Sequence, residues 1–382
     1  MNDGNELALL PNGLNDTLMP DAAIEAGMVA RLLERFARFG YELVKPPLAE
    51  FEDSLLEGPG GALAPQMFRV MDPVSQRMMG LRPDITPQIA RIATSRLGNV
   101  ARPVRLSYAG PVLQVKGSQL RPEREVTQVG IELIGSPALA ADAEVIIAMA
   151  EALNAVGVQN ASFDLTLPRL VTLLCSGMEL DYDTTNTVRA ALDRKDTGAL
   201  HKVASLLPEQ RETFEYLLST AGVAETSLDA LQKMSWPTAA RAQVRDLVTV
   251  VRLVREAVPQ LKLTVDPVEF RGLEYQTGVS FTIFARGVSG ELGRGGRYVL
   301  STGETATGAT LFMESLLQAA AAPPRQKAVY LPFGTKAAER QKLHADGWHT
   351  RAALAQDADS HTAAKAQGCT HVFTAGRVEA LA

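Results

Sequence analysis

The sequence predicts an α+β fold: an antiparallel sheet flanked by helices, a helical insertion, and a small C-terminal α/β module. Three observations predict it. Strand-like runs separated by turns cover residues 68–135, leucine-rich charged stretches with helical periodicity cover about 168–260, and strand-like and helical segments alternate beyond residue 326. The 382 residues are enough for a large domain over 1–320 and a smaller one over 326–382.

Composition and charge exclude several classes of protein. The formal net charge is -5, so no overall basic field attracts nucleic acid, although a local patch is still compatible with RNA. Two cysteines, Cys175 and Cys369, are too few for a disulfide framework or a zinc site. The acidic start and the lack of a long apolar run predict a cytoplasmic protein without signal peptide or membrane span. The histidines lack zinc spacing, so no metal and no cofactor are expected; they are His201, His344, His349, His361 and His371.

An amphipathic helix is expected first, over residues 20–40. Ile24, Met28, Leu32 and Phe36 recur at four-residue spacing, and Gly40 suits the C-terminal stop. The strand that follows, YELVKPPLAEF, contains two prolines that confine it to an edge or an interface. A second helix is expected over ALAADAEVIIAMAEALNAVG.

GLRPDITPQIAR is predicted to be a turn that enters a helix. Thr86 is expected to cap the helix, Pro87 to occupy its first turn, and Asp84 to favour its dipole. Arg82 is expected to pair with an acid. This local account explains the pattern without a ligand, so a functional role for the turn stays an alternative.

The stretch from Leu106 to Gly135 is predicted to be a hairpin with its loop near residues 116–123. In its second strand, Gln128 and Glu132 lie on one face about 13 Å apart, with Gly130 leaving room between them. A carboxylate in such an apolar run is costly to bury without a partner. Glu132 is therefore either part of a polar groove or one half of an ion pair with a nearby arginine.

Strand character returns at residues 262–287. Arg271 and Tyr275 share one face if the strand in FRGLEYQTGVSFTIFA is regular, and Arg271 would then anchor an anion or form a salt bridge at the rim. The glycines of GRGGRY are expected to form a tight turn, because no helix follows that would present its N-terminus to a phosphate. AAAAPPRQ, residues 319–326, reads as a linker before the C-terminal module.

Taken in order, these stretches resemble a class II aminoacyl-tRNA synthetase core, specifically that of the histidyl-tRNA synthetase family. The helix over 20–40 with its strand is similar to the dimer-forming first motif, and the hairpin is similar to the second. FRGLEYQTG and GRGGRY resemble the two histidine signatures. The resemblance implies an amino-acid pocket, for which the matching residues are Asp84, Thr86, Gln128, Glu132, Arg271, Tyr275 and Tyr298.

The departures from the synthetase pattern concern ATP. Gln114 and Lys116 stand where the second motif carries an arginine and a glutamate, and Ser315 stands where the third motif carries an arginine. Since cationic groups around the phosphates supply much of the catalysis in adenylyl transfer, adenylation is expected to be lost. Residues 326–382 carry seven Lys/Arg against five Asp/Glu, so a tRNA-reading surface is not expected.

A retained pocket with lost ATP contacts resembles the family of ATP phosphoribosyltransferase regulatory subunits. That resemblance implies a non-catalytic, dimeric subunit that joins a short-form catalytic subunit in a hetero-oligomer. It also implies a requirement for the first step of histidine biosynthesis and feedback control by L-histidine. Two alternatives stay open: an active histidyl-tRNA synthetase or related amino-acid-activating ligase, and a scaffold or sensor for a different partner.

Overall fold

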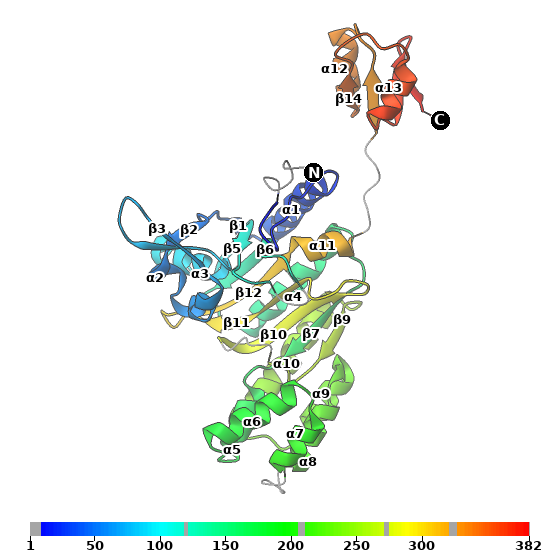
Figure 1. Ribbon diagram of the computed structural model, residues 1–382. Helices are drawn as coiled ribbons and strands as arrows, with labels where there is room; N and C mark the ends of the chain where they lie inside the picture. Colours follow the sequence, from blue (N-terminus) through cyan, green and yellow to red (C-terminus); the bar gives the residue numbers. More distant parts are fainter. Residues whose placement is uncertain (1–8, 118–120, 205–210, 271–274, 321–326, 382) are drawn as a thin grey trace, which may run out of the picture. The chain divides into compact units, whose positions relative to one another are not determined.

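The computed structural model describes residues 9–117, 121–204, 211–270, 275–320 and 327–381. The chain divides into two compact units, Met1–Ala321 and Ala322–Ala382. The described part of the first unit is built on a nine-stranded sheet in the order β1-β5-β6-β12-β11-β10-β7-β9-β8. From β5 to β7 in that order, each adjacent pair is antiparallel, as the sequence predicts. The flanking strands β1 and β9 pair in parallel with β5 and β7. Figure 1 shows this sheet running through the first unit.

The strands have unequal lengths, and the longest form the centre. The central strands are β5 (Val104–Leu113), β6 (Glu125–Ile134), β10 (Gln276–Ala285), β11 (Gly293–Val299) and β12 (Thr305–Phe312). The outer strands are β1 (Glu42–Leu43), β7 (Ala161–Thr166), β8 (Gly222–Val223) and β9 (Lys262–Val265). The predicted hairpin is therefore confirmed as β5 and β6.

Helices α1 (Asp21–Arg38) and α4 (Leu139–Ala155) cover one face of the sheet. Met28, Leu32 and Phe36 are buried, and Gly40 adopts a positive φ of 82° beyond the helix end, which confirms the predicted stripe and stop. These residues pack in one core with Val129, Ile131 and Leu133 of β6. The even-numbered residues of β6 face the opposite side, where Val126 and Ile134 pack in a second core on either side of Gln128 and Glu132.

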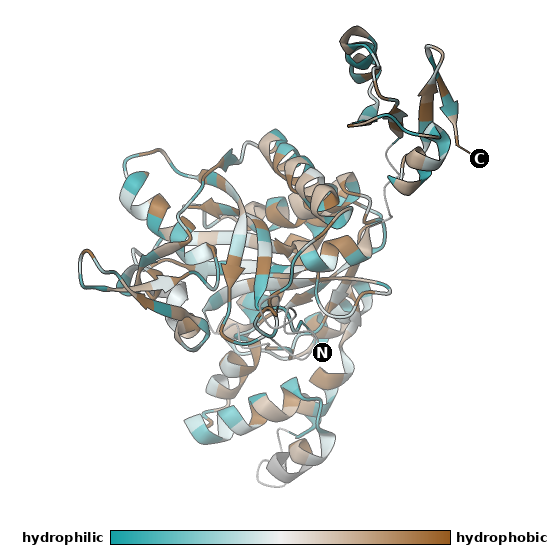
Figure 2. Ribbon diagram, turned by 45° about the horizontal axis from the view of Figure 1, so that its top comes forward, coloured by the Kyte–Doolittle hydropathy of each residue, from teal (hydrophilic) through white to brown (hydrophobic). Residues whose placement is uncertain are grey.

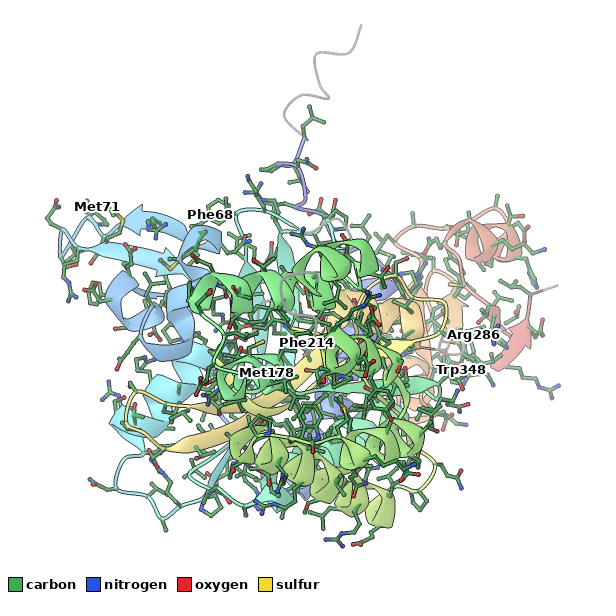
Figure 3. The ribbon with its side chains drawn as sticks, turned by 90° about the horizontal axis from the view of Figure 1, so that it is seen from below. Phe68, Met71, Met178, Phe214, Arg286 and Trp348 are labelled. Atoms are coloured by element: carbon green, nitrogen blue, oxygen red, sulfur yellow. The ribbon has the colours of Figure 1, made fainter. Side chains whose placement is uncertain are left out.

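Residues 168–260 are predominantly helical, as predicted. They form α5 (Leu170–Gly177), α6 (Tyr182–Asp193), α7 (Thr197–Ala204), α8 (Arg211–Ser219), α9 (Ala224–Lys233) and α10 (Thr238–Ala257). Helix α10 packs on α4. These helices alternate between hydrophilic and hydrophobic positions in Figure 2. Met178 and Phe214 lie among them in Figure 3, and Phe214 is fully buried there.

The first unit also contains a separate three-stranded sheet in the order β2-β4-β3. It consists of β2 (Ala49–Phe51), β3 (Phe68–Met71) and β4 (Met78–Leu81), with α2 (Glu52–Leu55) and a 3-10 helix (Gly58–Gln66) between the first two. Phe68 and Met71 lie on this sheet in Figure 3. Pro46 and Pro47 fall between β1 and β2, which are edge strands of their sheets. The prediction of one strand over residues 41–51 is therefore wrong, because the prolines separate two short strands, whereas the predicted edge position is confirmed.

The second unit is a small α/β module with strand order β14-β13-β15-β16. Its elements are β13 (Ala328–Leu331), α12 (Ala337–Ala345), β14 (His349–Ala352), α13 (Ser360–Ala366), β15 (His371–Thr374) and β16 (Arg377–Ala380). The last strand, β16, is an addition that the alternating pattern did not predict. In the first unit, α11 (Met313–Ala319) ends where the expected linker begins, and residues 321–326 of that linker lie outside the described residues.

Candidate functional site

The turn over residues 82–86 is clamped to the sheet from two sides. Arg82 donates from Nε to the carbonyl of Pro111 at 2.8 Å and from Nη1 to that of Pro46 at 3.1 Å. Gln128 Oε1 accepts the backbone N–H of Ile85 at 3.0 Å. The prediction that Arg82 pairs with an acid is wrong: its guanidinium satisfies backbone carbonyls and so fixes the shape of the turn.

Helix α3 (Thr86–Arg91) begins at this turn and continues as a π-helix over Ile92–Arg96. Pro87 lies in its first turn as predicted, but Thr86 does not cap it. Asp84 Oδ1 accepts the backbone N–H of Thr86 at 2.8 Å, and the Thr86 hydroxyl donates to Glu132 Oε1 at 3.1 Å. The cap prediction is wrong because the carboxylate of Asp84 already occupies the helix N-terminus, which leaves the hydroxyl free to face the sheet.

Glu132 is the chemical centre of the site. It is 1% exposed, and its two carboxylate oxygens accept from Thr86 and, at 2.8 Å, from the hydroxyl of Tyr298. Among the residues that the structure describes, no arginine pairs with it, so the ion-pair alternative has no support in those ranges. Burial raises the pKa of Glu132, and this effect is larger than the lowering by the hydroxyl donors, so that the pKa is about 8.

Gln128 and Asp84 form a second polar pair beside Glu132. Gln128 Nε2 donates to Asp84 Oδ2 at 3.1 Å, so both functional groups of the buried Gln128 amide are in use. Gln128 therefore lies behind Asp84 and orients its carboxylate. The predicted placement of Gln128 and Glu132 on one face of the strand is confirmed.

Glycines make the floor on which these side chains rest. A Cβ on Gly308 would lie 1.8 Å from Glu132 Oε2, and one on Gly130 would lie 2.4 Å from the hydroxyl of Tyr108. That hydroxyl is 2.6 Å from Thr310 Oγ1. Neither glycine position tolerates a side chain without displacing a polar group of the site.

GRGGRY is a strand, β11, and the prediction of a tight turn is wrong. A Cβ on Gly295 would lie 2.6 Å from both the Phe281 ring and the Ala309 Cβ, so the glycines permit close packing between central strands. Tyr298 at the end of this run reaches Glu132. Tyr275 precedes β10, is 37% exposed, and packs edge-on against Tyr298 with ring centroids 6.0 Å apart. Arg271 lies outside the described residues.

These side chains line a cavity of about 20 Å³, which has room for about one water molecule. Five of the seven residues predicted for the pocket line it: Asp84, Thr86, Glu132, Tyr275 and Tyr298. Gln276 and Arg294 also line it and were missed. The alternation along their strands was available in the sequence, but it does not show which face of a strand meets a cavity.

The three positions expected to have lost ATP contacts differ in their surroundings, and none of them lines the cavity. Gln114 donates from Nε2 to the carbonyl of Pro83 at 3.3 Å, Lys116 is exposed, and Ser315 is buried in α11. Two arginines lie near the ring of Phe312 at the end of β12. Arg121 stacks 3.7 Å over the Phe312 ring and donates to Glu291 at 2.9 Å, and Arg294 lies 5.8 Å from the same ring.

The described ranges offer no other centre of chemistry of the usual kinds. In them, no group of three or more His, Cys, Asp or Glu side chains is arranged to hold a metal ion. None of the helices found there combines the length and apolar character needed to cross a bilayer. Cys175 and Cys369 are both buried, and neither forms a disulfide.

Comparison with known proteins gives one consistent family. The sequence matches the family described as histidyl-tRNA synthetase over residues 13–316. A protein of Rhodospirillum centenum called ATP phosphoribosyltransferase regulatory subunit is 51% identical over 98% of this chain and 97% of its own. A protein of the same name from Paramagnetospirillum magneticum is 52% identical over 97% of each chain.

Solved structures share the fold at lower identity. A Bacillus halodurans structure described as an ATP phosphoribosyltransferase regulatory subunit/histidyl-tRNA synthetase has a TM-score of 0.80 at 23% identity, covering 94% of this chain and 96% of its own. A chain of the Thermotoga maritima ATP phosphoribosyl transferase (HisG:HisZ) complex has a TM-score of 0.61 at 17% identity, covering 76% and 97%. At these identities the likeness supports the fold alone.

Proposed function

Since the chain belongs to the histidyl-tRNA synthetase family and, within it, to the ATP phosphoribosyltransferase regulatory subunits, we propose that it binds L-histidine in the cavity around Glu132. Through that binding it places the first step of histidine biosynthesis under feedback control. As a regulatory subunit it is not the catalytic component of the transferase. The observation that carries the proposal is a buried carboxylate that has hydroxyl donors but no cation among its described partners.

The chemistry of Glu132 favours a cationic ligand. Without one, the burial that raises its pKa to about 8 keeps the carboxyl group protonated over much of the neutral range. An ammonium group beside Glu132 and Asp84 would favour the ionised form and form charge-assisted hydrogen bonds. A free amino acid supplies such a group, and residues that match the family's pocket surround it.

Feedback by L-histidine also requires a conformational response in the chain. A ligand that binds one arrangement better than another shifts the population toward it, which is the physical requirement for feedback. A coupling of about 1–3 kcal/mol is typical of such regulation.

We also propose that the protein joins the short-form catalytic subunit in a hetero-oligomer and associates with itself as a dimer. Two observations support the partner: the names of relatives that are 51% and 52% identical, and a solved complex with the same fold. The first-motif region, 20–51, supports the dimer with exposed Leu43 and Leu48. The near balance of charge in the C-terminal module, seven basic against five acidic residues over 326–382, supports the expectation that it does not read tRNA.

The test combines a pull-down with an activity assay. The full chain is expected to co-purify with the short-form catalytic subunit and to raise its transferase activity, and L-histidine is expected to lower that activity. A thermal-shift titration measures the pocket directly, because a ligand selective for the folded form raises its melting temperature. No response to millimolar L-histidine, alone or in the complex, would contradict the proposed pocket.

Amino-acid activation is a second candidate with one observation in its favour. Arg121 and Arg294 both approach the Phe312 ring on the cavity side of the sheet. Both also lie within 4 Å of Glu291, at 2.9 Å and 3.9 Å, so part of their charge is already compensated. Histidine-dependent pyrophosphate–ATP exchange separates the candidates: the regulatory proposal expects none, and clear turnover would replace it.

A further inference from the structure

Helix α6 of the helical insertion holds the chain shortly before β10. Asp193 Oδ1 accepts the backbone N–H of Phe270 at 2.8 Å, and the Arg189 guanidinium lies 4.0 Å from the centre of the Phe270 ring. Asp193 and Arg189 are four residues apart, so they project from one face of the helix. The same helix therefore holds Phe270 through both its backbone and its side chain.

The residues just before this contact are anchored on the same side. Asp266 is buried, and its carboxylate pairs at 2.6 Å with Nζ of Lys195, which lies just beyond the end of α6. Val268 is 3% exposed and belongs to the same core as Leu192 of α6. The backbone over residues 266–270 is therefore expected to follow the position of α6.

The first residues of β10 have little support from their own sheet. Pairing of β10 with β7 begins at Ser280, and its pairing with β11 shifts register between Gln276 and Ser280. The insertion supplies a contact on this stretch, since Gln243 on α10 donates from Nε2 to the carbonyl of Thr277 at 3.4 Å. The position of Gln276 therefore depends on contacts outside the sheet as well as on the sheet itself.

Two residues of the cavity wall lie between these two contacts with the insertion. Tyr275 and Gln276 both line the cavity around Glu132. Tyr275 follows Phe270 by five positions, which an extended chain spans with about 18 Å at most. Residues 271–274 lie outside the described residues. Because the connection is so short, a shift of Phe270 is expected to reach Tyr275.

We infer that the helical insertion sets the affinity of the cavity for its ligand, with Asp193 as the positioning residue. This deepens the proposed function and rests on it, since the ligand is L-histidine. Asp193 does not line the cavity; it acts by fixing Phe270, from which the chain continues to Tyr275. Coupling between two sites is reciprocal, so a partner that displaces α6 changes histidine affinity, and histidine changes the stability of the contact at α6.

The test measures the dissociation constant of L-histidine by calorimetry in variants of the full chain. Asp193→Ala removes the acceptor for the N–H of Phe270 and is expected to weaken histidine binding about tenfold, as is typical of coupled sites. Asp193→Asn keeps an acceptor oxygen at the same place and is expected to restore most of the affinity. Unchanged affinity in Asp193→Ala, or an equal loss in Asp193→Asn, would overturn the inference.

Asp181 at the start of α6 provides a matched control. Its Oδ1 also accepts a backbone N–H, that of Thr184 at 2.7 Å, but this contact lies within the helix itself. Asp181→Ala is expected to lower the melting temperature of the apo protein, because the helix loses its cap, and to leave histidine affinity unchanged. If Asp181→Ala and Asp193→Ala weaken histidine binding equally, the loss follows from the stability of the insertion and the inference fails.

Hydrogen exchange provides a signature that a purely structural contact would not produce. By reciprocity, saturating L-histidine is expected to slow amide exchange over residues 265–270 by about the factor by which Asp193→Ala weakens binding. The same protection in Asp193→Ala would contradict the inference. If the unaltered protein does not bind L-histidine, the proposed function falls and this inference with it. If it binds and Asp193→Ala binds equally well, only this inference fails.

Discussion

Glutamine in place of Glu132 removes the titratable group at the centre of the site while keeping its shape. Burial raises the pKa of Glu132 from 4.5 to about 8. The folded protein therefore holds this proton more tightly than the unfolded chain does. The resulting loss of stability begins as the pH rises through 4.5 and is complete above about 8, where it amounts to about 5 kcal/mol.

Glu132→Gln lacks that penalty, since glutamine does not ionise. The apo variant is expected to be as stable as the unaltered protein near pH 5 and more stable at pH 8, with a melting temperature higher by several degrees. Its histidine binding is expected to weaken, because a charged pair with the ammonium is replaced by a neutral contact. A loss of about 2 kcal/mol corresponds to about thirtyfold in Kd.

The assay is a thermal-shift series from pH 5 to pH 8 with and without L-histidine, supported by calorimetry. Glu304→Gln is the matched control. Glu304 does not line the cavity. Its carboxylate accepts from Arg102 Nε at 2.6 Å, and this pair lowers the pKa of Glu304. The control is expected to keep full histidine affinity. If Glu132→Gln binds histidine unchanged, or if its apo form unfolds, Glu132 is a structural residue and the reasoning about the ligand is refuted.

Three further changes test the site and its support. Histidine affinity is expected to rise about fiftyfold between pH 6 and pH 8, because at the lower pH the ligand's ammonium must displace the proton that Glu132 holds with a pKa of about 8. Calorimetry in Glu132→Gln should show a much smaller rise. Gly308→Ala places a Cβ 1.8 Å from Glu132 Oε2, so the thermal response to histidine should disappear, and a normal response would contradict the close approach. Asp142→Asn breaks the buried pair with Arg297, in which the closest contact is 2.6 Å, and should lower the free energy of unfolding by about 3–5 kcal/mol in denaturant titrations; a loss below 1 kcal/mol would show that Arg297 finds other partners.

The sequence predicts those parts of the site that depend on local periodicity. Alternation along β6 places Gln128 and Glu132 on one face without any tertiary information. The spacing of apolar residues in α1 and the turn residues between β5 and β6 are equally local. These features could be predicted because each depends on residues within a few positions of one another along the chain.

The wrong predictions concern residues whose role depends on distant partners. Thr86 has the chemistry of a helix cap, but Glu132, 46 positions further along the chain, takes its hydroxyl instead. The glycines of β11 have the composition of a turn, yet they are needed because Phe281 and Ala309 lie too close for a side chain. Gln276 gave no signal at all, since its place in the cavity exists only when the strands are assembled.

Glu132 connects the site to the rest of the fold through its partners. Its carboxylate receives one hydroxyl from Thr86 on α3 and one from Tyr298 on β11, while the residue itself belongs to β6. Behind Tyr298, Arg297 on the same strand is paired with Asp142 on α4. A change in the charge of one carboxylate therefore alters the balance of hydrogen bonds at three elements at once, one of them tied to a helix on the other face of the sheet.

Because packed elements shift between discrete arrangements and do not deform continuously, a ligand that ionises Glu132 can change surfaces that it does not touch. A side chain that lowers the stability of the empty protein is useful in a regulatory subunit for this reason: the free-energy cost of ionising Glu132 in the empty site is removed when the ligand's ammonium pairs with it.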